Sequence, residues 1–274
     1  MPELPEVETI RRGLEPALIS QKIISTRFFV RKLRWDIVAS NFDNYVNQKS
    51  ITSLSRRGKY IIIHLDNEAA VVIHLGMSGR LGLFEQTAIV EKHTHVIFYL
   101  ENGMELRFRD PRRFGSIEVA PPHLISSYPR FAHLGVEPLS NNFNPQYLKK
   151  KTEKSDRGIK LVIMDAKIVV GVGNIYANES LFYSRIDPRR RAKSLSVKEI
   201  KALEKSLKTV LNTAIEKGGT TLNDFRNAYG EPGFFQLELA VYGRADLPCP
   251  ECGTPIQKTV LGGRSTFFCP NCQN

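Results

Sequence analysis

The amino-acid sequence predicts an α+β protein in which an antiparallel β-sandwich comes first, a group of helices follows, and a small β-ribbon ends the chain. Three observations predict this fold class. Short runs rich in β-branched and aromatic residues fill positions 22 to 120, and helical capping signals replace them further along. All four cysteines lie in the last 26 residues. Strands and helices in separate stretches favour the α+β class over an alternating α/β fold.

The first expected element is a helix over residues 5 to 18. A proline is acceptable in the first turn, and the carboxylates of Glu6 and Glu8 face the positive end of the helix dipole. Apolar residues recur at helical spacing on one face, namely Val7, Ile10, Leu14 and Leu18. Pro2 and Glu3 therefore stand just ahead of a helix start.

Five apolar runs after this helix are expected to be β-strands, because they are β-branched or aromatic and turn residues separate them. Their sequences are KIISTRFFV at 22–30, YIIIHL at 60–65, AVVIHL at 70–75, THVIFYL at 94–100 and MELRFR at 104–109. The Asn-Gly pair at 102–103 predicts a hairpin between the last two. Strands that follow one another in this way favour an antiparallel sandwich.

Helical signals replace the strand pattern after residue 132. GIKLVIMDAKIV at 158–169 predicts one helix, and GVGNIYANESLFYS at 171–184 predicts a second, with glycines for a tight turn and Asn174 as its cap. The backbone N–H groups at that second helix start suit either a bound phosphate or a plain packing joint between helices. A capping box, SVKE at 196–199, predicts a third helix that runs to Gly218 and Gly219.

Residues 219–238 are rich in glycine and asparagine, and we expect them to form a long loop. The sequence accordingly predicts a sandwich domain at 1–132, a helical domain that includes this loop at 133–239, and a cysteine-bearing domain at 240–274.

The four cysteines form two Cys-x2-Cys pairs, Cys249 with Cys252 and Cys269 with Cys272, and sixteen residues, 253 to 268, separate the pairs. This spacing is typical of a tetrahedral zinc site with four thiolate ligands. Two disulfides are the alternative, but a chain without an export signal is expected in a reducing compartment, which favours the metal. Four protein ligands leave the metal no open position, so we expect one Zn²⁺ ion with a structural role.

The residues between the cysteine pairs, IQKTVLGGRSTFF at 256–268, predict two strands that turn at Gly262 and Gly263. Arg264 stands at the tip of this ribbon. An arginine beside a glycine turn can be merely solvated, or it can bind a phosphate if the zinc makes the ribbon rigid. The pattern leaves both interpretations open.

The charge balance favours a polyanionic partner. Lysine and arginine number 39 against 28 aspartate and glutamate residues, which gives a formal net charge of +11. The basic residues are clustered, at 31–34, 56–59, 112–113, 149–154 and 189–193, which favours nucleic acid over a merely well-solvated surface. No apolar run approaches the roughly 18 residues of a membrane span, and the acidic start differs from a secretory signal. We therefore expect a cytoplasmic protein that does not bind membranes.

The opening Met-Pro-Glu suggests chemistry at the chain's own amino group. An initiator methionine is commonly removed before a small residue, which would leave Pro2 with a free secondary amine. An α-amino group has a reference pKa of about 7.7 to 8.0, against about 10.4 for lysine, so far more of it is unprotonated at neutral pH. Such an amine can attack an electrophilic carbon and form an iminium while the Glu3 carboxyl protonates the departing oxygen. The alternative is that both residues only start a helix.

Six motifs taken together resemble the bacterial formamidopyrimidine-DNA glycosylases. They are PELPEVET at the start, RRGKY at 56–60, HLGMSG at 74–79, RDPRRFG at 109–115, GVGNIYANE at 171–179 and GGRSTFFCP at 262–270. The resemblance covers nearly the whole chain, in order. It implies a β-sandwich flanked by the first helix, a helix-two-turn-helix domain and a zinc ribbon. It also implies base-excision repair, in which oxidised purines such as 8-oxoguanine and formamidopyrimidines are removed from double-stranded damaged DNA and the strand is cut at the abasic site.

The resemblance also assigns roles residue by residue. Pro2 is the implied nucleophile on the sugar C1′, and Glu3 is the implied acid that helps to open the sugar ring. Lys59 is implied in β-elimination, and Arg264 in δ-elimination and in holding the phosphate. Further DNA contacts are implied for His74, His93, Arg157, Lys160 and Asn174. From the residues alone, Lys59 is equally an exposed lysine on a strand.

A base inside a duplex is out of reach, so such an enzyme must turn the nucleotide out, at a cost of a few kcal/mol, and something must fill the gap. The resemblance gives this task to Met77 as an apolar wedge, Phe114 as a stacking group and Arg112 as the hydrogen-bonding partner of the orphaned base. From the residues alone, Met77 and Phe114 are more simply core residues. The Met-Arg-Phe set favours purine lesions paired with cytosine. In the family, the loop at 219–238 folds over the flipped base.

Two other functions stay open. An endonuclease VIII-like glycosylase for oxidised pyrimidines shares the amino-terminal chemistry but lacks the Met-Arg-Phe set. A non-catalytic zinc-ribbon DNA-binding protein explains the charge and the helices, yet it gives no reason for a removable methionine ahead of Pro2 and Glu3. We expect a monomer that acts near the bacterial nucleoid and needs no small-molecule cofactor besides zinc.

Overall fold

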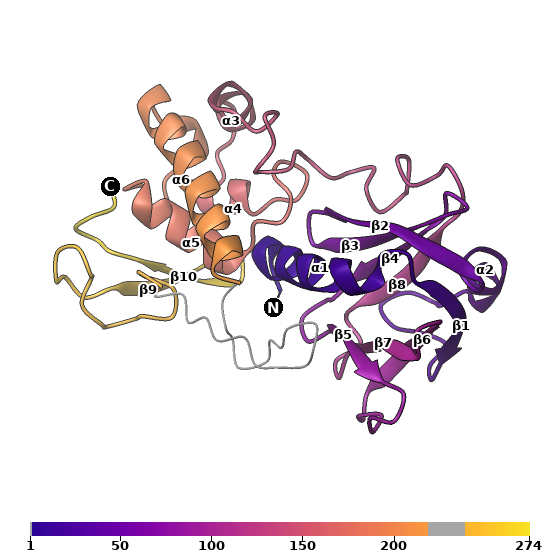
Figure 1. The fold of residues 1–274 in the computed structure, drawn as a ribbon. Coiled ribbons are helices and arrows are strands. Elements are labelled where there is room, and N and C mark those ends of the chain that lie inside the picture. The colour runs from indigo at the N-terminus through magenta and orange to yellow at the C-terminus, as the bar shows by residue number, and fades with distance from the viewer. Residues whose placement is uncertain (1, 219–238) are drawn as a thin grey trace. The chain divides into compact units, whose positions relative to one another are not determined.

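The computed structural model describes residues 2–218 and 239–274 (Figure 1). Within them the chain forms two compact units. The first holds residues 2–132 and Gly218, and the second holds 133–217 and 239–274. The loop predicted at 219–238 lies outside the described residues.

The first unit consists of antiparallel strands and two helices. In chain order its elements are α1 (Leu4–Leu18), β1 (Lys22–Phe28), α2 (Ala39–Tyr45), β2 (Lys49–Arg57), β3 (Tyr60–Leu65), β4 (Ala70–His74), β5 (Arg80–Glu85), β6 (Thr94–Leu100), β7 (Met104–Arg109) and β8 (Ser116–Ala120). The strands are hydrogen-bonded in the order β5-β7-β6-β1-β2-β3-β4-β8, and every neighbouring pair is antiparallel. The first helix and the five predicted strands are confirmed. The hairpin between β6 and β7 turns at Gly103, whose φ is +79°.

These strands form a sandwich because the sheet folds where β1 meets β2. The two strands share only the pairs Lys22 with Ser50 and Ile23 with Lys49. One apolar core joins the four strands on one side of this junction to the four on the other, and it includes Ile61, Ile63, Val71 and Ile73 from one half and Leu81, Val96, Phe98 and Phe108 from the other. The apolar stripe of α1 packs into the same core. The predicted antiparallel sandwich is confirmed.

Four elements of this unit have no signal in the sequence pattern: α2, β2, β5 and β8. β2 has the polar sequence KSITSLSRR, in which only Ile51 and Leu54 are buried. Gly82 interrupts the apolar run of β5, and β8 has only five residues. These strands form because β3, β7 and β4 offer them a hydrogen-bonding edge, which is tertiary context and not local preference.

The second unit consists of helices and a terminal β-ribbon. In chain order its elements are α3 (Pro145–Thr152), α4 (Ile159–Ile163), α5 (Asn174–Tyr183), the 3₁₀ turn η1 (Ala192–Ser194), α6 (Val197–Glu216), β9 (Gln257–Leu261) and β10 (Arg264–Phe268). The capping box before α6 is confirmed, since the Ser196 hydroxyl accepts from the Glu199 N–H and the Glu199 carboxylate accepts from the Ser196 N–H. The ribbon turns at Gly262 and Gly263, as predicted.

The helix predicted over 158–169 is wrong in its length, because α4 ends at Ile163. The backbone beyond it is used differently. The carbonyl of Ala166 accepts from the N–H of Gly135, and Val169 forms a parallel bridge with Val136. A segment whose backbone groups are paired with another segment cannot also satisfy them within a helix.

The expected cap of α5 is also wrong. Gly173 is the N-cap residue and Asn174 is already the first helical residue. The tight turn ahead of it does use a glycine, since Gly171 has φ +81°. Across residues 2–218 and 239–274, no helix is both long and apolar enough to cross a membrane.

Candidate functional site

The amino-terminal residues are held firmly at the start of α1. Glu3 is the N-cap residue of the helix, and Glu3 and Glu6 form a capping box in which the Glu6 Oε2 accepts from the Glu3 N–H at 2.8 Å. Glu3 is almost completely buried, whereas Pro2 is partly exposed. Pro2 therefore directly precedes a residue whose carboxyl group is buried and held at the start of α1.

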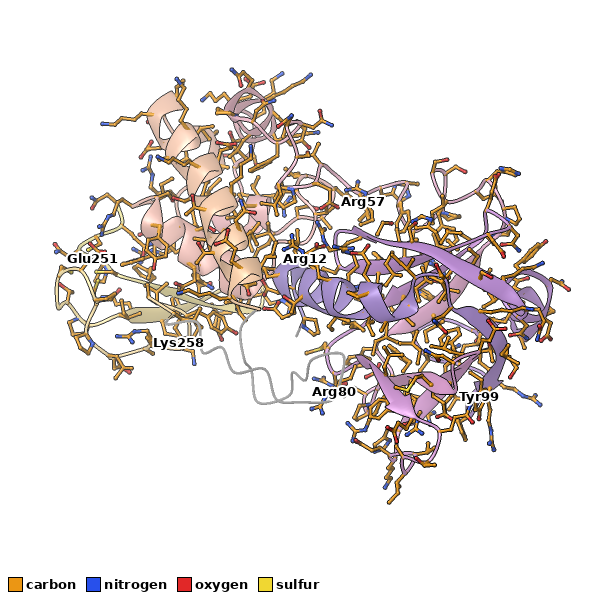
Figure 2. The ribbon with its side chains drawn as sticks, viewed as in Figure 1. Arg12, Arg57, Arg80, Tyr99, Glu251 and Lys258 are labelled. Atoms are coloured by element: carbon orange, nitrogen blue, oxygen red, sulfur yellow. The ribbon has the colours of Figure 1, made fainter. Side chains whose placement is uncertain are left out.

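A charged network ties α1 to the turn that carries Lys59. The Glu8 carboxylate accepts from Arg56 at 3.0 Å, and Arg56 also donates to the carbonyl of Gly58 at 3.1 Å. Burial alone would raise the pKa of Glu8, but hydrogen bonds from Arg11 and Arg12 and the charge of Arg56 hold that pKa below its usual value. Figure 2 labels Arg12 on α1 and Arg57 at the end of β2. The network fixes the β2–β3 turn against α1, so Lys59 is held in a defined position in the first unit.

His74 at the end of β4 is neutral at physiological pH. Burial lowers its pKa to about 4, and the charges of Arg34 and Lys59 contribute further. The ring Nδ1 lies 2.9 Å from the backbone nitrogen of Gly76, whose N–H donates to it. Because Nδ1 accepts a hydrogen bond, we infer that the ring proton is on Nε2. The ring can therefore donate one hydrogen bond from Nε2.

Met77, Arg112 and Phe114 all have exposed side chains, with exposed fractions of 37% for Met77 and 47% for Phe114. Neither apolar residue is therefore a core residue. The Arg112 guanidinium lies over the Phe114 ring, 4.8 Å from its centre. His93 lies next to the same loop, since its carbonyl accepts from the N–H of Asp110 at 3.0 Å.

The second unit carries the other predicted residues. Asn174 Nδ2 and Lys160 Nζ both donate to the carbonyl of Ser265, at 2.9 and 3.0 Å, and Lys160 also lies 2.7 Å from the Thr266 hydroxyl. Lys160 has no exposed surface, so its ammonium group points into the joint between α4 and β10 and not toward solvent. Arg264 is exposed at the start of β10, directly before Ser265.

Arg157 is an exposed residue that is already paired within the second unit. It forms an ion pair with Asp165 at 2.8 Å and donates to the carbonyl of Leu161 at 3.0 Å. The predicted site residues thus fall into two groups. The first unit holds Pro2, Glu3, Lys59, His74, Met77, His93, Arg112 and Phe114, and the second holds Arg157, Lys160, Asn174, Arg264 and the cysteines.

The cysteine sulfurs fit a tetrahedral zinc ion. All four Sγ atoms lie within 4.8 Å of one another, with 3.5 Å between Cys252 and Cys269 and 3.9 Å between Cys249 and Cys272. A tetrahedron with Zn–S bonds of about 2.3 Å has S–S edges of about 3.8 Å. These separations exclude the disulfide alternative, because an S–S bond is about 2.05 Å long. The four cysteines hold one structural zinc ion.

The zinc ribbon is attached to the helices by further contacts. The Phe267 N–H donates to the Asn178 Oδ1 of α5 at 2.9 Å, and Arg185 pairs with Glu251, which is labelled in Figure 2, at 2.8 Å. A side chain at Gly262 would lie 2.7 Å from Leu161, so the ribbon tip touches α4. The sequence-based reasoning missed Asn178 and Ser265, although both lie inside quoted motifs, because the partner of each is more than 80 residues away.

Comparison with known proteins agrees with this arrangement. Three family models match the chain: the formamidopyrimidine-DNA glycosylase N-terminal domain at 1–117, the H2TH domain of the same enzymes at 134–226, and a zinc finger found in FPG and IleRS at 246–274. Two curated relatives, both named formamidopyrimidine-DNA glycosylase, come from Legionella pneumophila strain Lens and Vibrio vulnificus. They are 47% and 49% identical over 273 residues, which is 100% of this chain and 98% and 100% of the relatives.

Solved structures match over the same length. The MutM (Fpg) protein of Thermus thermophilus superposes with a TM-score of 0.87 at 38% identity, covering 99% of this chain and 98% of that one. A point mutant of the Lactococcus lactis Fpg, solved with Fapy-dG containing DNA, superposes with a TM-score of 0.92 at 34% identity and full coverage of both chains. The resemblance expected from the motifs is confirmed, and the chain belongs to the formamidopyrimidine-DNA glycosylase family.

Proposed function

We propose that Pro2 is the nucleophile with which this DNA glycosylase of base-excision repair removes oxidised purines and then cuts the strand at the abasic site. One observation carries the proposal. Pro2 directly precedes Glu3, and Glu3 is buried and fixed in the capping box that starts α1. A free prolyl nitrogen at this position would be followed directly by a residue whose carboxyl group the fold holds in place.

The first step forms a bond between the Pro2 nitrogen and the sugar C1′. The glycosidic bond breaks, and the damaged base leaves with its electron pair. The attack leaves the Pro2 nitrogen as a protonated ammonium, and the base takes up the proton that this nitrogen gives up, which restores a lone pair on the nitrogen. The C1′–O4′ bond then opens, O4′ receives a proton from the Glu3 carboxyl, and the restored lone pair forms the iminium. The amine must lose its positive charge before it attacks. An α-amino group does so more readily than a lysine, because its reference pKa is only about 7.7 to 8.0.

The strand is cut after the iminium forms. The iminium acidifies the neighbouring C2′ proton, and its removal expels the 3′ phosphate in β-elimination. We propose that Lys59, which is held beside α1 by the Glu8 network, assists this step. Arg264 is proposed to hold the phosphate and to serve the later δ-elimination, from an exposed position on a strand that the zinc ribbon makes rigid.

Other residues are proposed to bind the DNA around the lesion. His74 donates from Nε2 to a backbone phosphate, and His93, Arg157 and Asn174 add further contacts. For Lys160 an indirect contribution is better supported, because its buried ammonium group holds the carbonyl of Ser265 next to Arg264. Met77, Phe114 and Arg112 are proposed to fill the gap that the flipped nucleotide leaves, which their exposure permits.

The finer statements about the protein are proposals of the same kind. We propose that the enzyme acts as a monomer on double-stranded damaged DNA, in the bacterial cytoplasm and close to the nucleoid. Its chain is proposed to divide into domains at 1–132, 133–239 and 240–274. The net charge of +11 supports binding to a polyanion, and zinc is the one cofactor proposed.

A borohydride trapping assay tests the nucleophile. The protein is incubated with a duplex that carries 8-oxoguanine opposite cytosine, and borohydride is added to reduce the iminium to a stable crosslink. We expect a crosslink from the unaltered protein, and none from Pro2→Gly or from a chain that retains Met1. Pro145→Gly is the control, because it makes the same change at a proline near the start of another helix, α3, in the second unit.

Two other outcomes would change the assignment. Full excision by Pro2→Gly or by the Met1-retaining chain would refute the nucleophile, and a protein that binds the duplex but never traps would be a DNA-binding protein without catalysis. A second candidate substrate class is supported by the L. lactis Fpg, which was also solved with oxidised pyrimidine containing DNA. Much stronger trapping on an oxidised thymine than on 8-oxoguanine would favour that class.

A further inference from the structure

Two loops of the first unit meet at one buried carboxylate, that of Asp110. Its Oδ1 accepts from the Ser78 hydroxyl at 2.6 Å, and its Oδ2 accepts from the Gly115 N–H at 2.8 Å. The Arg112 N–H also faces Oδ1, at 3.3 Å. Asp110 has no exposed surface. One loop carries Met77 and the other carries Arg112 and Phe114, so a single side chain joins the loops of all three residues.

The two loops also touch backbone to backbone beside this carboxylate. Gly76 has φ +65°, and a Cβ atom there would lie 2.4 Å from the carbonyl carbon of Phe114. No other residue type fits without a shift of the backbone. The turn that presents Met77 is closed by a hydrogen bond from the Gly79 N–H to the Leu75 carbonyl at 2.8 Å. The backbones of the two loops are therefore in direct contact, and the hydrogen bonds of Asp110 fix the distance between them.

Asp110 itself is fixed on its other side. Its N–H donates to the carbonyl of His93 at 3.0 Å, and its own carbonyl lies 2.8 Å from Nε2 of the buried His95, which donates to it. The N–H of Arg113, a residue with φ +56°, also donates to that carbonyl at 3.2 Å. Asp110 thus connects the end of β7 rigidly to both loops.

We infer that Asp110 is a positioning residue for insertion into DNA: it holds Met77, Arg112 and Phe114 at the mutual spacing that fills the gap behind a flipped nucleotide. This inference rests on the proposed function of those three residues. Groups that are ordered before binding lose little conformational freedom when they enter the base stack. Loops without the carboxylate must be ordered during insertion, which slows flipping and weakens the recognition of the opposite base. The chemistry at Pro2 does not need this step when the site is already open.

Two variants and one control test the inference in the full-length, zinc-bound protein. Ser78→Ala removes one hydroxyl donor to the carboxylate. Asp110→Asn replaces one of the two carboxylate oxygens with an NH₂ group. This group is a donor and cannot accept the hydrogen bond from the Ser78 hydroxyl or the Gly115 N–H that it faces. Thr26→Ala is the control, because the Thr26 hydroxyl makes a similar partly buried hydrogen bond, 2.9 Å to Asn47, on β1.

We expect both variants to excise 8-oxoguanine opposite cytosine roughly tenfold more slowly in single-turnover assays, the loss that one such hydrogen bond predicts. Discrimination between cytosine and adenine opposite the lesion should also narrow. Borohydride trapping on a preformed abasic site in single-stranded DNA should stay unchanged, since no duplex has to be opened there. The control should match the unaltered protein in all three assays.

The inference is overturned if Ser78→Ala and Asp110→Asn keep full excision and full discrimination. It is also overturned if abasic-site trapping falls as much as excision, because a general loss of structure would explain that result. If Asp110→Asn does not fold, Ser78→Ala decides alone. A failure of the unaltered protein to trap on the abasic site would refute the Pro2 assignment instead, so the two failures are distinguishable.

Discussion

At the scale of single residues, His74 shows how the backbone selects one form of a titratable side chain. The Gly76 N–H occupies Nδ1, and burial with the nearby charges of Arg34 and Lys59 lowers the pKa to about 4. A neutral ring with its proton on Nε2 donates one hydrogen bond and brings no charge of its own. The phosphate contact proposed for this ring then depends on the position of the ring and not on its protonation.

We expect the His74 ring to stay neutral from pH 7 down to about pH 5. The neutral ring is favoured in the folded protein, while in the unfolded chain the ring takes up a proton near its ordinary pKa of 6.5. The contribution of His74 to the stability of the folded protein is therefore fully present above pH 6.5 and is lost as the pH falls toward 4. Nitrogen NMR shifts of the ring would show the Nε2–H tautomer, and His74→Ala identifies the signal. A cationic ring at about pH 6 would contradict the prediction.

Lys160 shows how much of a residue's environment only the structure reveals. The resemblance implies a contact with DNA, and in the structure the ammonium group is completely buried on Ser265 and Thr266. A buried ammonium needs oxygen partners, and the carbonyl and hydroxyl of β10 supply them. Its partners lie more than 100 residues away in the chain, so no local sequence pattern predicts these contacts.

At the scale of elements, β10 is held in place by α5. The side-chain Oδ1 of Asn178 accepts from the Phe267 N–H, and the side-chain Nδ2 of Asn174 donates to the Ser265 carbonyl. The helix and the strand lie side by side (Figure 1). Arg264 is the first residue of the same strand. The direction in which Arg264 leaves the ribbon is therefore set by the helix, and the zinc ion sets the fold of the ribbon itself.

Asn178→Ala should separate these two contributions. The variant leaves the buried Phe267 N–H without its acceptor, which costs about 1 to 3 kcal/mol of stability. We expect bound zinc to stay at one ion per chain while the ratio of δ- to β-elimination products falls, because Arg264 is less well placed. Zinc content and product gels measure the two effects.

The matched control for this prediction is Gln257→Ala, a change of an exposed residue on β9. An unchanged product ratio in Asn178→Ala would show that α5 does not position Arg264. Loss of the metal in the same variant would show that the attachment to α5 and the zinc site cannot be separated.

At the scale of the whole molecule, the proposed binding of DNA depends on both the zinc site and the net charge. The ribbon packs into only a small core, which it shares with Phe182 of α5. Cys249 and Cys269 are themselves members of this core, so the fold of the ribbon depends on the metal. The formal charge of +11 supplies attraction that any duplex shares. The phosphate contact proposed for Arg264 on the ribbon adds to that general attraction.

Removal of zinc with a chelator should weaken binding to damaged duplex by roughly tenfold or more, because ligand binding and local folding are coupled at such a site. The salt-dependent attraction of the remaining basic surface should persist. Fluorescence anisotropy at several salt concentrations measures both, and added Zn²⁺ should restore the affinity. If the chelated protein bound damaged duplex normally, the DNA contact proposed for Arg264 would not require a folded, zinc-bound ribbon.

Much of this architecture follows from local sequence. The first helix, five strands, the capping box of α6 and the glycine turn of the ribbon carry their own periodic or capping signals. Polar β2 and short β8 do not, because their hydrogen bonds come from the neighbouring strands. The predicted helix over 158–169 stops at Ile163 for a related reason, since the following backbone pairs with residues near 135.

The sequence by itself determined the family, the α+β class, the zinc ligands and the residues that carry the proposed chemistry. These features are recognised from short contiguous motifs, and such motifs can be identified without knowing which residues contact them in the folded chain. Only the tertiary structure decided that Lys160 faces inward, that Met77 and Phe114 are exposed, and that Asp110 joins two loops. Burial and hydrogen bonding depend on partners tens of residues away, and those partners meet only when the chain has folded.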